Sequence, residues 1–284
     1  MPKTWLITGS SRGFGRELVK AVLEGEAGDS VVATARRPEQ LGELVQQYGD
    51  RVRAVALDVT NAVAAHAAVE RAVDVFGSLD VVVNNAGYAN SAPIEDTSDE
   101  DFRAQIETNL FGVVNVSKAA VPVLRAQGSG HFVQFSSIGG RVGGSPGLAA
   151  YQTAKFGVEG FSEVLRSEME PFGVKVTIVE PGAFRTEWGG ASMERRETSE
   201  AYAGTVGAMN DFRLSTVCQW PGDPARAARV IEGIVRLEEP PRRLLLGSDA
   251  VRMAGEADRA RIAETEEWAD LSSSTDFPAG ADTA

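Results

Sequence analysis

The chain is poor in the features that mark secreted, membrane-bound and disulfide-linked proteins. It has one cysteine, Cys218, among 284 residues, so no disulfide can form within it. A reducing cytoplasm is therefore the expected compartment, and a lone thiol of this kind is more often a buried apolar filler than a nucleophile. The first residues show no basic segment followed by an apolar core and a cleavage site. No apolar run approaches the roughly 18 residues that a membrane span requires.

Positive charge and histidine are scarce as well. The 28 Lys and Arg residues stand against 40 Asp and Glu, which leaves a formal net charge of −12. An acidic surface repels phosphate backbones, so we expect neither nucleic acid nor an anionic membrane as a general partner. The two histidines, His66 and His131, have no partners at metal-ligand spacing, and we expect no metal site.

The chain does contain a regular alternation of short apolar runs and longer segments of helical period. Runs that are apolar throughout are typical of strands buried on both faces. The alternation predicts an α/β fold with a Rossmann-type doubly wound parallel sheet of about seven strands, ordered 3-2-1-4-5-6-7, and helices on both faces. The expected strands are residues 4–8, 31–35, 52–57, 79–84, 131–136, 174–180 and 243–246, and the expected helices are about 13–24, 38–48, 62–76, 99–126, 149–172 and 224–238.

The domain organisation is simple. No internal repeat or long linker divides the chain, so we predict a single domain over residues 1–270. A substrate-loop insertion at about 189–221, which mixes glycine, aromatic residues and charges, interrupts the rhythm after the sixth strand. A charged helical segment follows at 249–269, and the polar residues 271–284 are typical of a disordered tail.

A glycine-rich turn follows the first predicted strand and opens the first helix. Its sequence is Thr8-Gly9-Ser10-Ser11-Arg12-Gly13-Phe14-Gly15. Glycines allow the backbone to approach a pyrophosphate closely, and the helix N-terminus favours the negative charge of that group. The spacing differs from the common G-x-G-x-x-G fingerprint, and three glycines could also form a merely flexible turn. The position between a strand and a helix favours the phosphate-binding interpretation.

The end of the second strand bears on the type of nucleotide. An acidic residue there accepts hydrogen bonds from a ribose 2′-hydroxyl, whereas arginine suits a 2′-phosphate. Here the strand runs into Arg36 and Arg37, with no acid before Glu39, and Arg12 adds a third cation. Guanidinium groups bind phosphate well, so NADP(H) is favoured over NAD(H), although these arginines could also be ordinary surface charges.

Tyr151 and Lys155 stand four residues apart at the start of a predicted helix. Positions i and i+4 share a helix face, so the ammonium group can lie near the phenol. A free tyrosine has a pKa of about 10, and a close cation favours the phenolate. The pair therefore predicts a proton donor and acceptor for an alcohol oxygen. Taken alone, the spacing could also arise by chance.

Together these motifs resemble the short-chain dehydrogenase/reductase family. The glycine turn, Asn84-Asn85-Ala86-Gly87, Tyr151-x-x-x-Lys155 and Pro181-Gly182 followed by Thr186 stand in the order typical of that family. The resemblance covers roughly residues 3–188 and continues more weakly to about 247. It implies an oxidoreductase that interconverts a ketone or aldehyde and an alcohol with NADP(H), and a homo-oligomer as the assembly.

The resemblance also implies the contacts with the cofactor. Asp58 and Val59 would flank the adenine, Asn85 would lie along the adenosine ribose, and Lys155 would bind the nicotinamide ribose as well as lower the pKa of the phenol. The full expected set is Gly9, Ser11, Arg12, Gly13, Phe14, Gly15, Arg36, Arg37, Asp58, Val59, Asn85, Ala86, Gly87, Tyr151, Lys155, Pro181, Gly182, Phe184 and Thr186.

Two further catalytic residues follow from the same resemblance. Asn109 matches the helical asparagine that holds a water in a proton relay towards lysine. The active serine is usually the second of a pair at the end of the fifth strand, which selects Ser137, 14 residues before Tyr151. Ser136 is the alternative, because a slightly shorter spacing is more common. The serine hydroxyl would hydrogen-bond the substrate oxygen as charge develops there.

The substrate is expected to be a carbonyl compound or alcohol of moderate hydrophobicity. The apolar residues expected to line its pocket are Leu148, Phe184, Trp188, Met193, Tyr202, Met209 and Phe212, with no obvious fixed positive charge among them. Two other functions stay open: a non-catalytic NADP(H)-binding sensor on the same fold, and epimerisation or dehydration of nucleotide sugars. The presence of both Tyr151 and Lys155 opposes the first, and the lack of a larger C-terminal substrate domain opposes the second.

Overall fold

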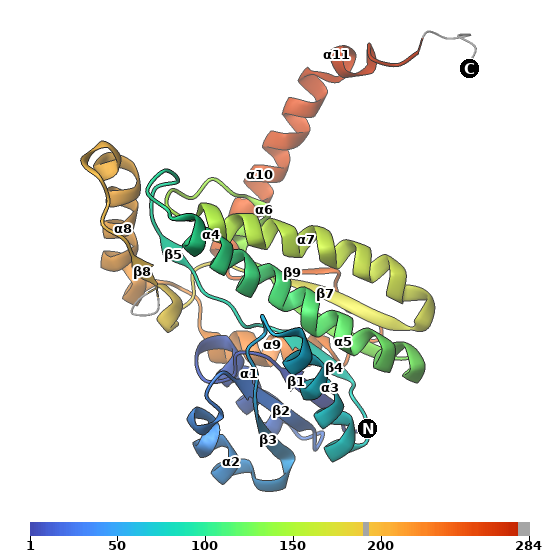
Figure 1. Ribbon diagram of the computed structural model, residues 1–284. Coiled ribbons are helices and arrows are strands. Elements are labelled where there is room, and N and C mark those ends of the chain that lie inside the picture. The colour runs from blue at the N-terminus through green and yellow to red at the C-terminus, as the bar shows by residue number, and fades with distance from the viewer. Residues whose placement is uncertain (190–192, 278–284) are drawn as a thin grey trace.

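The computed structural model describes residues 1–189 and 193–277, and its centre is one parallel sheet of seven strands (Figure 1). The strand order is β3-β2-β1-β4-β6-β7-β9, and every neighbouring pair is parallel. The predicted α/β class and the predicted order of the seven main strands are therefore confirmed. The strands are β1 (Thr4–Ile7), β2 (Ser30–Ala35), β3 (Val52–Ala56), β4 (Val81–Asn84), β6 (Gly130–Phe135), β7 (Val174–Pro181) and β9 (Arg243–Leu246).

The sheet is buried on both faces, and strand β1 shows why its residues are apolar throughout. Trp5 and Ile7 point into one core, while Leu6 between them points into the other. All three side chains are fully buried. Successive side chains of a strand point to opposite faces, so a central strand between two helical layers needs an apolar residue at every position.

Helices cover both faces of this sheet. The first core is closed by α1 (Gly13–Glu24), α2 (Gly42–Tyr48) and α9 (Pro224–Ile234), and the second by α3 (Ala62–Phe76), α5 (Gly112–Gln127) and α7 (Ala149–Met169). The bounds of α1 and α3 agree with the segments expected from the sequence. Local chemistry explains the ends of α3: the Asn61 side chain accepts a hydrogen bond from Ala64 N, and Gly77 ends the helix in a left-handed conformation.

The helical segment expected at 99–126 is present but is not regular. It consists of α4 (Asp99–Ile106), a π-helical turn (Glu107–Phe111) and α5. Single π turns inside α-helices often mark functional sites, and this one contains Asn109. Hydrophobic periodicity averaged over the whole segment does not resolve such a turn, because it is only five residues long.

Several short elements were not expected from the sequence. They are α6 (Ile138–Arg141), and β5 (Asn90–Ser91) paired in parallel with β8 (Glu194–Arg195), and α8 (Ala208–Thr216). Strand β8 and helix α8 belong to the insertion at 189–221, of which residues 190–192 lie outside the described part. Cys218, in the same insertion, is exposed, so the expectation of a buried apolar filler is wrong.

The C-terminal helix α10 (Ser248–Glu267) starts at the sheet and then runs out from the body of the protein, with α11 (Ala269–Ser273) at its far end (Figure 1). Helix α11 therefore reaches three residues into the segment expected to be a disordered tail, and its residues are exposed. Residues 278–284 of that segment lie outside the described part. Within 1–189 and 193–277, no helix is long and apolar enough to cross a membrane.

Candidate active site

The glycine turn between β1 and α1 leaves no room for side chains. Gly9 and Gly13 have φ values of 68° and 54°, a region that only glycine adopts readily. A Cβ atom on Gly15 would lie 2.3 Å from the Gly9 carbonyl oxygen, and one on Gly9 would lie 2.9 Å from Ala86 Cα. The turn is thus packed tightly from behind, which holds its outer backbone in one conformation.

The turn after β4 supplies that support. The Thr8 hydroxyl accepts hydrogen bonds from the backbone N–H groups of Asn85 and Ala86, both at 3.0 Å. The Asn85 amide donates to the carbonyls of Thr8 at 2.9 Å and Gly9 at 3.2 Å. The expectation placed the Asn85 side chain along a ribose. In the structure this side chain instead ties the glycine turn to the sheet.

The three arginines considered for a 2′-phosphate lie at the surface near the carboxyl ends of β1 and β2. Arg12, Arg36 and Arg37 are exposed, and in the described part of the chain none of them forms an ion pair. By contrast, the neighbouring Arg16 pairs with Glu43 at 2.5 Å. Three unpaired guanidinium groups in an acidic protein leave a local positive field that suits an anionic ligand.

A cavity of about 820 Å³ lies beside this turn. It is bounded on one side by the glycine turn and the start of α1, and on the other by the loop after β7 and by the insertion. The lining residues are Ser11, Arg12, Gly13, Arg16, Glu17, Arg185, Thr186, Glu187, Val217, Cys218 and Pro224. The closely packed glycines and the cavity with Arg12 in its lining suit ligands that carry phosphate groups, and the size of the cavity is compatible with a dinucleotide.

Two aromatic residues expected to contact the cofactor are instead part of the core. The ring of Phe184 lies 4.9 Å from that of Phe14, which in turn lies 5.5 Å from that of Phe135. Phe184 is only 6% exposed. Its side chain therefore belongs to the core, and from the 181–186 loop it is Arg185 and Thr186 that line the cavity.

The other expected cofactor residues have mainly supporting contacts. Asp58 is exposed and accepts hydrogen bonds from the Thr60 backbone and hydroxyl, while Val59 is buried beneath Gly112. A Cβ atom on Gly182, next to Pro181, would lie 2.4 Å from an Asp249 carboxylate oxygen. The same carboxylate accepts a hydrogen bond from Ala183 N at 2.7 Å. Asp249, which the sequence did not single out, thus fixes the loop after β7 to the start of α10.

Tyr151 lies in the first turn of α7 and is 8% exposed. Burial raises the pKa of its phenol to about 12, while a hydrogen bond with the Ser137 side chain lowers it by a smaller amount. We expected Lys155 to lower the phenol pKa, but in this structure burial dominates and the pKa is raised. At neutral pH Tyr151 is therefore a protonated phenol.

Lys155 lies one turn further along α7 and is 4% exposed. Its Nζ atom is 5.6 Å from the centre of the Tyr151 ring and donates a hydrogen bond to the Phe135 carbonyl at 2.7 Å. Burial lowers the pKa of the ammonium group to about 8, and the charge of Glu159 opposes that shift. Lys155 thus remains mostly charged at pH 7, although its proton is far easier to remove than that of a free lysine.

The two candidate serines at the end of β6 differ in their surroundings. Ser137 is the N-cap of α6, where its hydroxyl accepts a hydrogen bond from Gly139 N at 3.1 Å, and it reaches the Tyr151 phenol. Ser136 is buried against Gly140, and its hydroxyl has no hydrogen-bond partner among the described residues. It lies towards Glu159, whose pKa is raised by burial, while Ser136 and Arg243 act in the opposite direction. Only Ser137 therefore lies beside the phenol.

Asn109 is fully buried and is held from two sides. Its amide group donates to the carbonyls of Tyr88 and Gln105, both at 2.8 Å, and its oxygen accepts from Tyr88 N at 3.0 Å. A Cβ atom on Gly87 would lie 2.5 Å from that oxygen and 3.8 Å from Lys155 Nζ. The missing side chain of Gly87 therefore leaves Asn109 and Lys155 facing the same small space.

An apolar wall adjoins the phenol. Tyr151 packs with Ala89, Leu148 and Met193 in a small buried cluster, and the Trp188 ring lies 5.2 Å from the Tyr151 ring. Of the other expected pocket residues, Phe212 is 60% exposed and Phe184 is part of the core, as described above. Of the expected pocket residues, Leu148, Trp188 and Met193 are thus the ones that pack against Tyr151.

The insertion also contains a fixed positive charge that the sequence analysis did not recognise. Arg213 of α8 is 6% exposed. It donates to Ser145 Oγ at 2.7 Å, to Pro146 O at 3.0 Å and to Asn210 Oδ1 at 3.3 Å. Burial and the like charge of Arg195 lower its pKa to about 10. Its position in an irregular segment gave no periodic signal of burial.

Comparison with known proteins gives a consistent picture. A family model described as short chain dehydrogenase matches residues 3–197. Oxidoreductase BOA17 from Botryotinia fuckeliana (strain B05.10) is 50% identical over 273 residues, which cover 96% of this chain and 98% of that protein. A 3-ketodihydrosphingosine reductase from Bacteroides thetaiotaomicron is 41% identical over 186 residues, 65% of each chain.

Two solved structures are similar as well. A short-chain dehydrogenase from Streptomyces avermitilis has a TM-score of 0.89 and 40% identity, and the match covers 97% of this chain and 98% of that one. An alcohol dehydrogenase from the archaeon Thermococcus sibiricus, complexed with 5-hydroxy-NADP, has a TM-score of 0.69 and 26% identity, covering 87% of this chain and 96% of that one.

Proposed function

Since the chain belongs to the short-chain dehydrogenase/reductase family, we propose that it interconverts a ketone or aldehyde and an alcohol with NADP(H). The observation that carries this proposal is the meeting of four side chains from three segments. Ser137 contacts the phenol of Tyr151, Lys155 lies beneath it, and Asn109 faces Lys155 across Gly87. A phenol, a hydroxyl and an ammonium group at one apolar wall can move a proton to a carbonyl oxygen and stabilise the charge that develops there.

Each residue has a distinct part in reduction. A bound dihydronicotinamide would supply the hydride to the carbonyl carbon. Tyr151 donates its proton to the carbonyl oxygen, and the Ser137 hydroxyl donates a hydrogen bond to the same oxygen. Lys155 stabilises the resulting phenolate with its charge, and the free lone pair of Asn109 Oδ1 can hold a water that returns the proton. Because the free phenol has a raised pKa, reduction at neutral pH is the direction that this arrangement supports.

The cofactor preference rests on the arginines. The second strand ends at Arg36 and Arg37 without an acid, and these side chains and Arg12 have no acidic partner within the described residues. A 2′-phosphate would supply the missing negative charge. The similar archaeal alcohol dehydrogenase, solved with 5-hydroxy-NADP, adds support by analogy.

The substrate class follows from the wall around Tyr151. Leu148, Trp188 and Met193 favour an apolar group next to the reacting carbon. A ketone is consistent with the 3-ketodihydrosphingosine reductase among the similar proteins. We therefore propose a moderately hydrophobic ketone, aldehyde or secondary alcohol as substrate.

The assembly we propose is a homo-oligomer. Phe111 next to α5 and Phe156 on α7 are 46% and 45% exposed, although both lie on the helices that carry the candidate catalytic residues. Large apolar side chains at a surface favour a protein partner. Light scattering on the purified chain tests this, and a strictly monomeric mass over a wide concentration range would contradict it.

The test of the catalytic proposal is a panel of carbonyl compounds and alcohols, assayed with NADPH and NADH in parallel. Tyr151→Phe should still bind NADPH, measured by cofactor fluorescence, but should lose turnover by orders of magnitude because no proton donor remains. A near-normal rate in this variant contradicts the mechanism. NADPH binding by the wild type without turnover of any panel member would favour the sensor function instead, and a preference for NADH would contradict the role of Arg36 and Arg37.

A further inference from the structure

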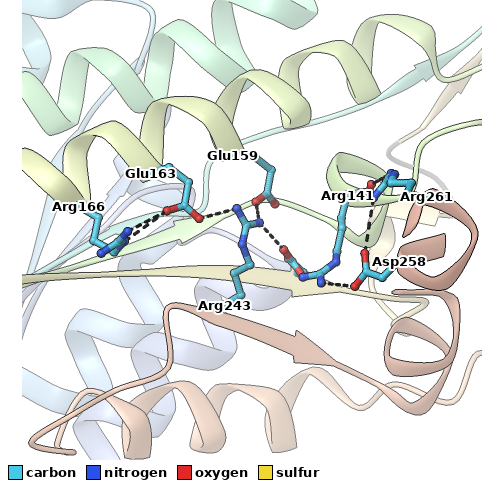
Figure 2. A network of polar contacts seen from close by, with 8 residues as sticks. Arg141, Glu159, Glu163, Arg166, Arg243, Asp258 and Arg261 are labelled. Atoms are coloured by element: carbon cyan, nitrogen blue, oxygen red, sulfur yellow. Dashed lines mark hydrogen bonds and ion pairs between the residues drawn. The ribbon is translucent and has the colours of Figure 1, made fainter. Parts of the chain in front are cut away.

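A network of acidic and basic side chains linked by ion pairs lies under helix α7 (Figure 2). It begins at Glu159, which is four residues after Lys155 and therefore on the same face of α7. Glu159 is 7% exposed, and one of its carboxylate oxygens accepts a hydrogen bond from Arg243 of β9. Its other oxygen, Oε1, is buried without a hydrogen-bond partner. The sequence analysis did not single out this residue.

The ion-pair network continues across the sheet. Arg243 also donates to Glu180 of β7 at 2.9 Å and to Glu163 at 2.6 Å. The side chain of Glu180 is fully buried, and Arg141 at the end of α6 approaches it at 3.3 Å. Arg141 in turn pairs with Asp258 of α10 at 2.5 Å. Glu159 is therefore held by a network that joins α7, the sheet, α6 and the C-terminal helix.

We propose that Glu159 is a positioning residue for Lys155: fixed by Arg243, its carboxylate keeps the lysine side chain charged and in place beneath the Tyr151 phenol. This inference rests on the proposed function only in that Lys155 is taken to be catalytic. The electrostatic part of it concerns the protein alone and can be tested without substrate or cofactor.

The surroundings of Lys155 explain why it needs such a partner. The elements packed against it offer the neutral phenol of Tyr151, the Phe135 carbonyl at the end of β6, the backbone of Gly140 in α6 and the neutral amide of Asn109. The other charged groups of the network that holds Glu159 include Glu180, Arg243 and Arg141. A buried ammonium group with only neutral neighbours tends to lose its proton, so a carboxylate one helical turn away is what favours the charged form.

The two opposing effects on the pKa of Lys155 agree with this geometry. Burial lowers the pKa of Lys155 to about 8, and the charge of Glu159 acts in the opposite direction. If that negative charge is removed, the pKa should fall further, towards or below neutral. At pH 8 most of the enzyme would then carry an uncharged lysine, which can neither stabilise a phenolate nor hold a ribose hydroxyl as an ammonium group does.

The experiment is an NMR titration of the lysine side chains. The chain has only five lysines, so protein labelled with carbon-13 at lysine Cε gives few resonances, and a Lys155→Met variant assigns the one of interest. In wild type the Lys155 resonance should titrate near pH 8. In Glu159→Gln we expect the midpoint to fall by about one pH unit, the usual effect of losing a close opposite charge.

The matched control is Glu163→Gln. It also removes an acidic partner of Arg243, but one turn further along α7 and away from Lys155. Its Lys155 midpoint should stay within about 0.2 units of wild type, because this charge is screened and distant. An unchanged midpoint in Glu159→Gln, or an equal shift in both variants, would overturn the inference.

Enzyme kinetics provide an independent readout. In reduction, kcat of Glu159→Gln should fall at pH 8 by about fivefold and recover at pH 6, where Lys155 is again protonated. Loss of the same factor at both pH values would indicate a purely structural role and contradict the inference.

A second variant, Glu159→Asp, covers the case in which Glu159→Gln does not fold. It keeps the negative charge, so the Lys155 midpoint should stay close to that of wild type. A midpoint that falls by about one pH unit in Glu159→Asp would overturn the inference. An inactive wild type would contradict the proposed function but leave the NMR titration valid.

Discussion

Two sets of arginines lie near the active site, and their charges are balanced in different ways. Arg243 and Arg141 contact the buried carboxylates Glu159 and Glu180. The pKa of Arg141 is raised mainly by Asp258 and further by Glu180, and that of Arg243 is raised by its acidic partners against the effect of burial. Arg213 in the insertion is more deeply buried, donates only to neutral oxygens, and feels the like charge of Arg195, so its pKa is lowered to about 10.

The difference indicates how the two regions serve the site. A carboxylate without its arginine is costly to bury, so the network under α7 holds together as one unit and fixes Lys155. The insertion is held by hydrogen bonds to neutral groups, which cost less to break. We infer that the frame of the catalytic helix is the rigid part of the site and that the insertion is the part that can adapt to a substrate.

The largest effect is expected from Arg243→Met. The change leaves Glu159 without its ion-pair partner and Glu180 with only Arg141, so the free energy of unfolding should fall by about 3–5 kcal/mol. Urea unfolding measures this. Arg252→Met on the exposed side of α10, which loses only a surface pair with Glu256, should cost less than about 0.5 kcal/mol. Equal losses in the two variants would show that the buried network has no special weight.

An acid titration tests a third buried basic group, His131, for which residues 1–189 and 193–277 supply no acidic partner. His131 is 3% exposed, and burial together with the charges of Lys175 and Lys3 lowers its pKa to about 3. Its Nε2 atom lies 2.9 Å from Thr177 Oγ1, whose hydroxyl donates to Pro241 O at 2.7 Å, so Nε2 carries the ring proton.

The lowered pKa of His131 determines whether stability rises or falls with pH. Between about pH 6.5 and pH 3 the unfolded chain binds the proton and the folded chain does not, so stability falls as pH falls. Wild type should lose about 3 kcal/mol from this residue by pH 4. His131→Gln should unfold with a shallower dependence on pH over that range. An identical pH dependence in the two proteins would contradict the lowered pKa.

A smaller effect is expected from Arg213→Met. The variant loses hydrogen bonds to neutral acceptors but also loses an unfavourable buried charge, so the free energy of unfolding should fall by only about 1–2 kcal/mol. Because Arg213 holds the Ser145–Pro146 segment that leads into α7, KM for the substrate should rise more than kcat falls. A loss of stability as large as that of Arg243→Met would remove the distinction between the two regions.

The smallest expected effect is a difference between the pH dependence of alcohol oxidation and that of carbonyl reduction. A phenol with a pKa of about 12 must lose its proton before it can accept one from an alcohol, so alcohol oxidation should accelerate as pH rises from 7 and level off above about pH 8, where Lys155 loses its charge. Reduction should not accelerate over the same range. Initial rates in both directions check this, and oxidation that is independent of pH would contradict the raised pKa of Tyr151.

Much of the fold was predictable because its signals are local. The seven main strands, the parallel sheet and the bounds of α1 and α3 follow from apolar runs, helical period and capping residues within about 20 residues of one another. The π turn around Asn109, the β5–β8 pair and the elements of the insertion were not predicted, because short or irregular elements leave no period to detect.

The candidate site divides in the same way. The glycine turn and the pair Tyr151 and Lys155 are visible in the sequence, since turns and helix faces bring together residues only a few positions apart. The burial of Phe184 against Phe14 and the proximity of Ser137 to the phenol depend on segments that pack only in the folded chain. Ser136 and Ser137 are adjacent in sequence, but their hydroxyl groups lie on different sides of the end of strand β6. Only the folded structure therefore shows that Ser137 lies beside the phenol.

The sequence alone thus determined the sheet and the order of its strands, and it singled out Tyr151 and Lys155 as the proposed proton donor and its lysine, because these depend on spacing along the chain. Only the tertiary structure decided the charge state of that pair. The phenol pKa is raised by burial, and the partner of Lys155 is held by Arg243, which is 84 residues from Glu159 in sequence. Burial and long-range ion pairs are properties of the packed protein, and no local pattern of residues encodes them.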